Sequence, residues 1–132
     1  MLVPCEIAVK CVLPAVRAML AKELMVKHYL KQTEAARLLG VSQPAISLYT
    51  RKIRGKAIDL KNEPEITDLV TELAASMVKG NLAHKDYIPQ FCEICKTIRA
   101  KGLLCKMHKA FDPAINIDEC LLCTTPNMVK CA

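Results

Sequence analysis

The sequence has no apolar run long enough to cross a membrane. None of its 132 residues belongs to an unbroken stretch that approaches the roughly 20 apolar residues of a transmembrane helix. Residues 1–4 also lack the positively charged segment and the cleavage site of a signal peptide. We therefore expect a cytoplasmic protein that does not enter a membrane.

Two further absences narrow the fold class and the function class. The period-two alternation typical of strands is weak throughout, whereas apolar residues recur at helical spacing. No acid/base pair and no glycine-rich phosphate-binding loop accompanies the cysteines. We predict an all-α protein that is not an enzyme; a thiol-disulfide or cluster-transfer enzyme is the weaker alternative.

Acidic residues are scarce in the N-terminal half. Residues 1–60 contain ten Lys or Arg and four Asp or Glu, whereas residues 61–132 contain nine of each kind. The net charge of +6 therefore lies in residues 1–60. Because Lys and Arg drive association with nucleic acids by neutralising phosphates, this half is expected to meet a polyanion. A solvated basic face is the alternative that charge alone leaves open.

Apolar periodicity predicts the main helices. Residues 14–29 carry apolar side chains on one face, and Pro14 either kinks one long helix that begins near Pro4 or separates two helices. Residues 63–79 carry a second apolar stripe. This stripe either forms a dimer interface or closes the core of its own chain. Residues 81–90 are predicted to be a linker.

Residues 32–51, QTEAARLLGVSQPAISLYTR, match a helix-turn-helix pattern. Thr33 is predicted to cap a first helix over residues 33–39, and Gly40 permits a left-handed turn after it. Ser42 is then the predicted cap of a second helix that has Pro44 in its first turn. Small Ala36 and apolar Ile46 suit the crossing of the two helices, although any tight helical hairpin would need similar residues.

Polar side chains on the second helix predict contacts with DNA. In this motif the second helix enters the major groove with its N-terminal residues at base edges. Gln43 is placed to pair with adenine, Ser47 can contact a base or a phosphate, and Arg51 suits guanine or a phosphate. Thr33 and Arg54 are expected to contact phosphates. The predicted DNA-binding residues are Thr33, Ser42, Gln43, Pro44, Ser47, Arg51, Lys52 and Arg54.

Five cysteines are spaced as metal ligands: Cys92-x2-Cys95, Cys105 and Cys120-x2-Cys123. In a reducing cytosol, thiols at this spacing are more often ligands or redox groups than disulfides. Four thiolates suit an iron-sulfur cluster, 4Fe-4S or 2Fe-2S, and equally a zinc ion. We predict a redox-labile cluster that controls DNA affinity, with structural zinc as the alternative. His108, three residues after Cys105, is expected at the surface.

The segment TEAARLLGVSQPAISLYTRKIRG resembles the phage-repressor and Cro-like class of helix-turn-helix. The whole chain is similar to a group of archaeal transcriptional regulators, in which a PCEI-type helix precedes the motif and a segment like FCEICKTIRAKGLLCKMH follows it. This resemblance implies a DNA-binding regulator with a C-terminal cysteine-rich sensor module. Some of these regulators carry a further thiamine-phosphate synthase domain, which this chain lacks, so a thiamine phosphate ligand is not expected.

These observations predict three parts. Residues 1–60 form the helix-turn-helix DNA-binding domain, residues 61–80 a linking or dimerisation helix, and residues 81–132 the cysteine-rich metal-binding module. Since one helix-turn-helix rarely binds tightly enough, we expect a homodimer on palindromic double-stranded DNA, with recognition helices about 34 Å apart. The rival interpretation is an interaction protein whose zinc module binds another protein.

Overall fold

The computed structural model describes residues 2–80, 84–116, 118–120 and 123, which are mostly helical and contain no strand. The predicted all-α class is therefore confirmed for these residues. No helix among these residues is both long and apolar enough to span a membrane. The elements in chain order are α1 (Pro4–Ile7), the π-helical turn η1 (Ala8–Val12), α2 (Leu13–Val26), α3 (Gln32–Leu39), α4 (Gln43–Thr50), α5 (Pro64–Lys79), α6 (His84–Ala100) and α7 (Cys105–Phe111).

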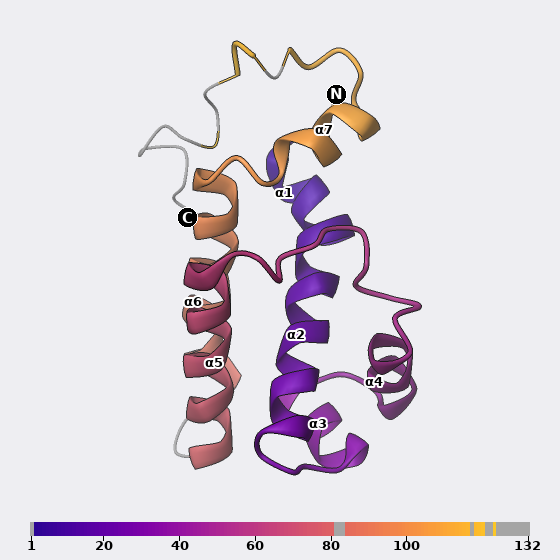
Figure 1. Ribbon diagram of the computed structural model, residues 1–132, viewed down its shortest axis with the longest axis vertical. Coiled ribbons are helices and arrows are strands. Elements are labelled where there is room, and N and C mark those ends of the chain that lie inside the picture. The colour runs from indigo at the N-terminus through magenta and orange to yellow at the C-terminus, as the bar shows by residue number, and fades with distance from the viewer. Residues whose placement is uncertain (1, 81–83, 117, 121–122, 124–132) are drawn as a thin grey trace.

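The first three elements form one continuous rod at the centre of the molecule (Figure 1). Pro14 lies in the first turn of α2, directly after η1. Because a proline lacks the N–H of the helical ladder and its ring clashes with the preceding turn, the wider π turn accommodates it without ending the helix. Of the two alternatives for Pro14, one long helix is therefore correct.

The apolar stripe of α5 closes the core of its own chain. Its buried residues pack between α2 and α6, the two helices that α5 contacts most. The opposite side of α2 carries α3 and α4. The helix ends at Gly80, which has a left-handed φ of 68°. The buried residues of the stripe are Ile66, Val70, Leu73, Ala74 and Met77.

The linker predicted at residues 81–90 is wrong where the structure describes it. Residues 81–83 lie outside the described part, but α6 begins at residue 84 and contains Pro89. Tyr87 is buried, and its hydroxyl donates to the Ser76 carbonyl oxygen of α5 at 3.4 Å. Burial of the α6 face against α5 therefore outweighs the cost of Pro89, which lies inside the helix and cannot donate a backbone hydrogen bond there.

The N-terminal segment is held against α7 at one end of the molecule (Figure 1). The Leu2 N–H donates to Asp112 Oδ2 at 3.1 Å, and His108 Nε2 lies 2.7 Å from the Leu2 carbonyl oxygen. The expectation that His108 lies at the surface is wrong, since it is only 4% exposed. Buried residues from all three predicted parts, from Ile7 to Cys123, belong to one core cluster.

Candidate functional site

The turn between α3 and α4 has the geometry that the sequence predicts. Gly40 has a φ of 68°, in the left-handed region, and the Val41 N–H donates to the Ala36 carbonyl oxygen at 3.0 Å. The Ser42 hydroxyl accepts the Ala45 N–H at 3.2 Å, which confirms Ser42 as the cap of α4. These bonds satisfy backbone groups at both helix ends and fix the chain direction between the two helices.

The predicted cap at Thr33 is wrong. Helix α3 begins one residue earlier, at Gln32, and is capped by Lys31. The backbone N–H of Lys31 donates to Glu34 Oε2 at 3.2 Å. An acid at the third helical position can satisfy the cap residue in this way, so a hydroxyl at Thr33 is not needed there. Thr33 remains exposed in the first turn of α3.

A small apolar core holds α3 and α4 together and against α2. Ala36, Ile46 and Tyr49 are 5%, 0% and 6% exposed, respectively. Small Ala36 allows a close approach of the two helices, while Ile46 fills the space between them. Tyr49 is therefore a core residue. This packing fixes which face of α4 is left outside.

The outer face of α4 carries the predicted DNA-reading residues. Gln43, Ser47 and Arg51 follow one another at intervals of four residues, which aligns them on one side of the helix. Gln43 and Arg51 are exposed, and Ser47 is half-buried. The Gln43 side-chain amide donates to Gln32 Oε1 at 2.6 Å, so its orientation is set from α3. Pro44 is also exposed, in the first turn.

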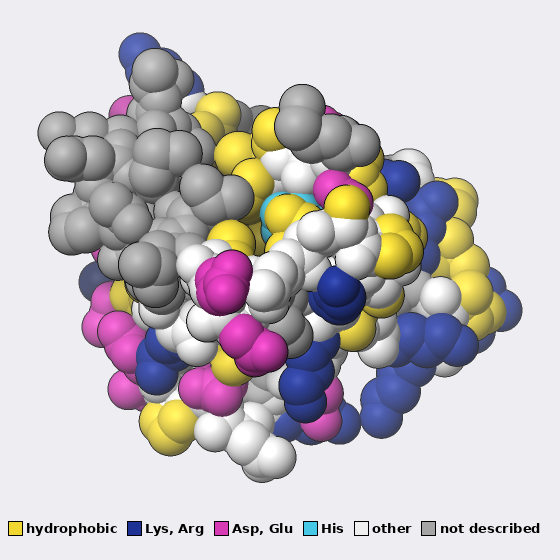
Figure 2. Space-filling model, turned by 90° about the horizontal axis from the view of Figure 1, so that it is seen from above, with side chains coloured by type: hydrophobic (Ala, Val, Ile, Leu, Met, Phe, Trp, Pro, Cys, Tyr) yellow, Lys and Arg dark blue, Asp and Glu magenta, His cyan; other side chains and the backbone are white. Residues whose placement is uncertain are grey.

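Basic residues continue from α4 into the loop that follows it. Lys52, with a left-handed φ of 57°, turns the chain out of the helix, and the backbone N–H groups of Ile53 and Arg54 both donate to the Leu48 carbonyl oxygen. Lys52 and Arg54 are exposed. Figure 2 shows Lys and Arg gathered on the side of the molecule where Figure 1 places α4 and this loop. Asp and Glu gather on the opposite side.

The five predicted metal ligands lie on three segments. Cys92 and Cys95 are on α6, Cys105 begins α7, and Cys120 and Cys123 follow α7. Burial raises the pKa of the Cys105 thiol, and the neighbouring thiols of Cys123 and Cys120 raise it further. Among the described residues, however, no three His, Cys, Asp or Glu side chains gather into a group that could hold a metal.

A buried arginine lies among the thiols instead. Arg99 is 5% exposed, and its Nη1 donates to Cys5 Sγ at 3.7 Å. Burial lowers the pKa of the guanidinium, but a hydrogen bond with Cys123 and the charges of Cys123, Cys5 and Cys95 raise it overall. Sequence reasoning places Arg99 among the cations near the cysteines but treats Cys5 as a small apolar residue. Arg99 follows Cys95 by one helical turn, whereas no spacing links Cys5 to this group.

An apolar groove runs beside this arginine. It has a volume of about 490 Å³, and Cys5, Cys92, Cys95 and Arg99 line it together with apolar residues of the central rod and α6. Val9 and Ile88 on its walls are each 60% exposed. The groove thus combines a thiol-rich end with an exposed apolar surface.

The two hydrogen bonds at Leu2, from its N–H to Asp112 and between its carbonyl oxygen and His108, form a clamp. This clamp holds α7, with Cys105, against the start of the central rod. The Leu2 carbonyl oxygen can only accept, so the facing Nε2 of His108 carries a proton. The hydrogen bond from the Leu2 N–H lowers the pKa of Asp112, and the Ala114 N–H lowers it further. The carboxylate form of Asp112 is therefore the one that holds the N-terminal segment.

Comparisons with known proteins gave no match to a family model, to a curated protein or to a solved structure.

Proposed function

We propose that the protein is a transcriptional regulator that binds double-stranded DNA with α4 in the major groove. The observation that carries this proposal is the outer face of α4, where Gln43, Ser47 and Arg51 lie in line while Ile46 and Tyr49 fix the inner face. A rigid helix with outward amide, hydroxyl and guanidinium groups suits the hydrogen-bonding pattern of base edges.

Phosphate contacts would come from the residues around that face. Thr33 and Ser42 lie at the N-terminal ends of α3 and α4, where backbone N–H groups and the helix dipole favour an anion. Lys52 and Arg54 extend the contact along the DNA backbone from the following loop. These contacts would position the protein without reading sequence.

We propose a homodimer on a palindromic operator, because two recognition helices double the contacts. The apolar stripe of α5 packs against helices of its own chain, so the dimer interface must lie on another surface. The apolar groove with Val9 and Ile88 is our candidate. Because Cys5, Cys92 and Cys95 line the same groove, chemistry at these thiols would alter the dimer and hence the affinity for DNA.

We also propose that Cys92, Cys95, Cys105, Cys120 and Cys123 supply the thiolates for an iron-sulfur cluster, with zinc as the second candidate. The donor chemistry fits either group, and an iron-sulfur cluster would supply redox chemistry. The described arrangement does not gather three of these ligands, and Arg99 lies between Cys5, Cys95 and Cys123. Loading would therefore have to rearrange the segment after α7.

Metal content tests the cofactor separately from DNA binding. Protein purified without oxygen is expected to be brown, to contain iron and acid-labile sulfide, and to bleach in air. Elemental analysis and the visible spectrum check this result. One zinc per chain and no colour would make the site structural. Absence of both metals would refute the cofactor and leave the DNA proposal in place.

Two substitutions test the assignment of the DNA-contacting face. Gln43→Ala is expected to lose discrimination at one base pair, by about 1–3 kcal/mol, because it removes a base-edge contact. Arg54→Ala is expected to weaken cognate and random DNA alike and to reduce the salt slope of binding by about 1. Binding isotherms on both DNAs at several salt concentrations measure these effects.

Lys79→Gln, at the C-terminal end of α5, is the control for a lost positive charge. It should leave the discrimination between base pairs and the salt slope of DNA binding unchanged. Equal losses on cognate and random DNA for the Gln43 and Arg54 variants would show that α4 does not read bases. Absence of DNA binding in the unmodified protein would refute the proposal outright.

A further inference from the structure

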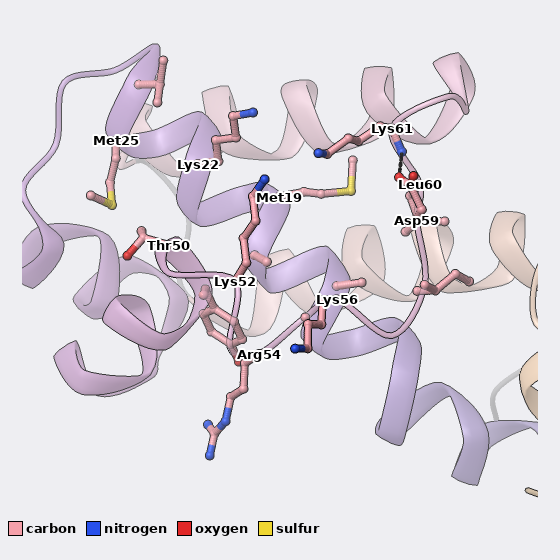
Figure 3. A pocket seen from close by; sticks show the side chains of 16 residues that line it. Met19, Lys22, Met25, Thr50, Lys52, Arg54, Lys56, Asp59, Leu60 and Lys61 are labelled. Carbon is pink, nitrogen blue, oxygen red and sulfur yellow. Dashed lines mark hydrogen bonds between the residues drawn. The ribbon is translucent and has the colours of Figure 1, made fainter.

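A cavity lies between α2 and the loop of residues 51–61, beside the end of α4 (Figure 3). Its volume is about 490 Å³, within the range of sites that hold small molecules. None of the proposed base-reading residues Gln43, Ser47 and Arg51 lines it, although Tyr49 and Thr50 of α4 do. The cavity shares no lining residue with the groove that Cys5 and Cys92 line, so the two are separate sites.

The inner wall of the cavity is apolar. Met19 and Met25 of α2 line it, and Ile58 and Leu60 of the loop face them. The two methionines are only partly buried, although they pack against the core. Flexible thioether side chains adapt to the shape of an apolar ligand, so this wall suits a hydrocarbon chain.

The rim of the cavity is cationic. Lys22 of α2 and Lys52 and Lys61 from the two ends of the loop line it, and Figure 3 shows their ammonium ends directed toward one another beside Met19. None of the three lysines takes part in an ion pair within the part of the chain that the structure describes. Ammonium groups that converge in this way repel one another, and an anion between them would replace that repulsion by attraction.

Acidic residues at the rim do not neutralise these lysines. Among the described residues that line the cavity the one acid is Asp59, and its Oδ1 accepts the backbone N–H of Lys61 at 3.0 Å. Arg54 and Lys56 add two further cations to the lining, although Figure 3 shows Arg54 extending away from the three lysines. The site thus has a strong net positive charge over an apolar wall.

The loop that forms the outer wall is fixed against α2. Gly55 has a φ of +76°, and a Cβ at this position would lie 2.6 Å from the Pro14 carbonyl oxygen and 2.8 Å from Ala18 Cβ. Lys52 also has a left-handed backbone, which a lysine rarely adopts. A non-glycine residue held in this region is often found at a functional site. The cavity is therefore a built feature of the fold.

We propose that this cavity binds a small amphipathic anion. An apolar chain would lie against Met19 and Met25, and a carboxylate or phosphate would lie among Lys22, Lys52 and Lys61. Because Lys52 also belongs to the predicted DNA contacts, a bound ligand would compete with the DNA backbone. That link to DNA rests on the proposed function, whereas ligand binding itself does not.

Calorimetric titration with four ten-carbon probes tests the site. Decyl phosphate and decanoate, kept below their micellar concentrations, are expected to bind saturably at one site per chain. Decanol and decyltrimethylammonium at the same concentrations are expected not to bind. Binding of the phosphate alone would identify a phosphate head group, and binding of both anions would show that the site recognises the negative charge of the head group and not its shape. Equal binding of decanol, or no binding of either anion, would overturn the proposal.

The double substitution Lys22→Gln with Lys61→Gln is expected to raise the dissociation constant of the anionic probe about tenfold, since two partly screened charges are lost. Lys79→Gln should leave it unchanged, and circular dichroism checks that each variant is folded. An unchanged dissociation constant in a folded double variant would overturn the assignment of the head-group site. If the probe binds without weakening DNA binding, the cavity stands and its link to DNA is refuted.

Discussion

Gly55→Ala is expected to lower the free energy of unfolding by about 2–5 kcal/mol, as the sum of backbone strain and overpacking. The φ of +76° is unfavourable for alanine, and the new Cβ would meet Pro14 O and Ala18 Cβ at 2.6 and 2.8 Å. The Pro14 oxygen belongs to the central rod and has no freedom to move away. Urea denaturation, followed by circular dichroism, measures the loss.

Gly80→Ala is the matched control for this prediction. Gly80 has a similar φ of +68°, but a Cβ there would find its nearest neighbour, Val78 O, at 3.9 Å. This variant should show only the backbone cost of about 1–2 kcal/mol. The difference between the two variants isolates the close approach of the loop to α2. Equal losses would mean that the loop is not held against the rod.

Ile98→Ala is expected to destabilise the protein by about 2–5 kcal/mol, because it removes a fully buried side chain and leaves a cavity. Ile98 is 0% exposed on α6, the helix that carries Cys92 and Cys95. Ile88→Ala on the same helix is the control, since Ile88 is 60% exposed; because Ile88 lies in the proposed dimer groove, both variants are compared at a protein concentration that keeps them monomeric. The effect of Ile88→Ala should lie within about 0.5 kcal/mol. Denaturant unfolding of both variants makes the comparison.

The same two variants show whether apolar packing or metal binding stabilises α6. If α6 is held by its apolar face against α5, the difference between Ile98→Ala and Ile88→Ala should persist after treatment with a chelator. The helical signal of the unmodified protein should persist as well. Loss of the difference, together with a drop in helicity, would show that metal ligation and not burial folds this region.

The α3–α4 pair could be predicted in detail because its signals are local. Gly40, Ser42 and Pro44 each act within one turn of the chain, and the structure has all three where the sequence places them. The prediction of a cap at Thr33 is wrong because Lys31 is the cap residue and Glu34 satisfies its backbone N–H. Where two residues offer a similar hydrogen bond, local preference does not choose between them.

The C-terminal half was harder to predict because its arrangement depends on distant residues. Pro89 has the local signature of a linker, yet Tyr87 and Ile98 bury the helix that contains it. His108 has a polar side chain and the spacing of a ligand, yet its partner is the carbonyl oxygen of Leu2. The burial of α6 and the hydrogen bond of His108 each depend on which helices come together. The periodicity of the sequence therefore predicts neither of them.

The clamp on Leu2 has a consequence for synthesis of the protein. Its two hydrogen bonds span 110 and 106 residues of the chain. A nascent chain made from its N-terminus cannot form them until residue 112 has left the ribosome, and contacts of such long range form late in folding. The local α3–α4 pair can form much earlier. The start of the central rod therefore lacks its partner α7 until α7 has been translated.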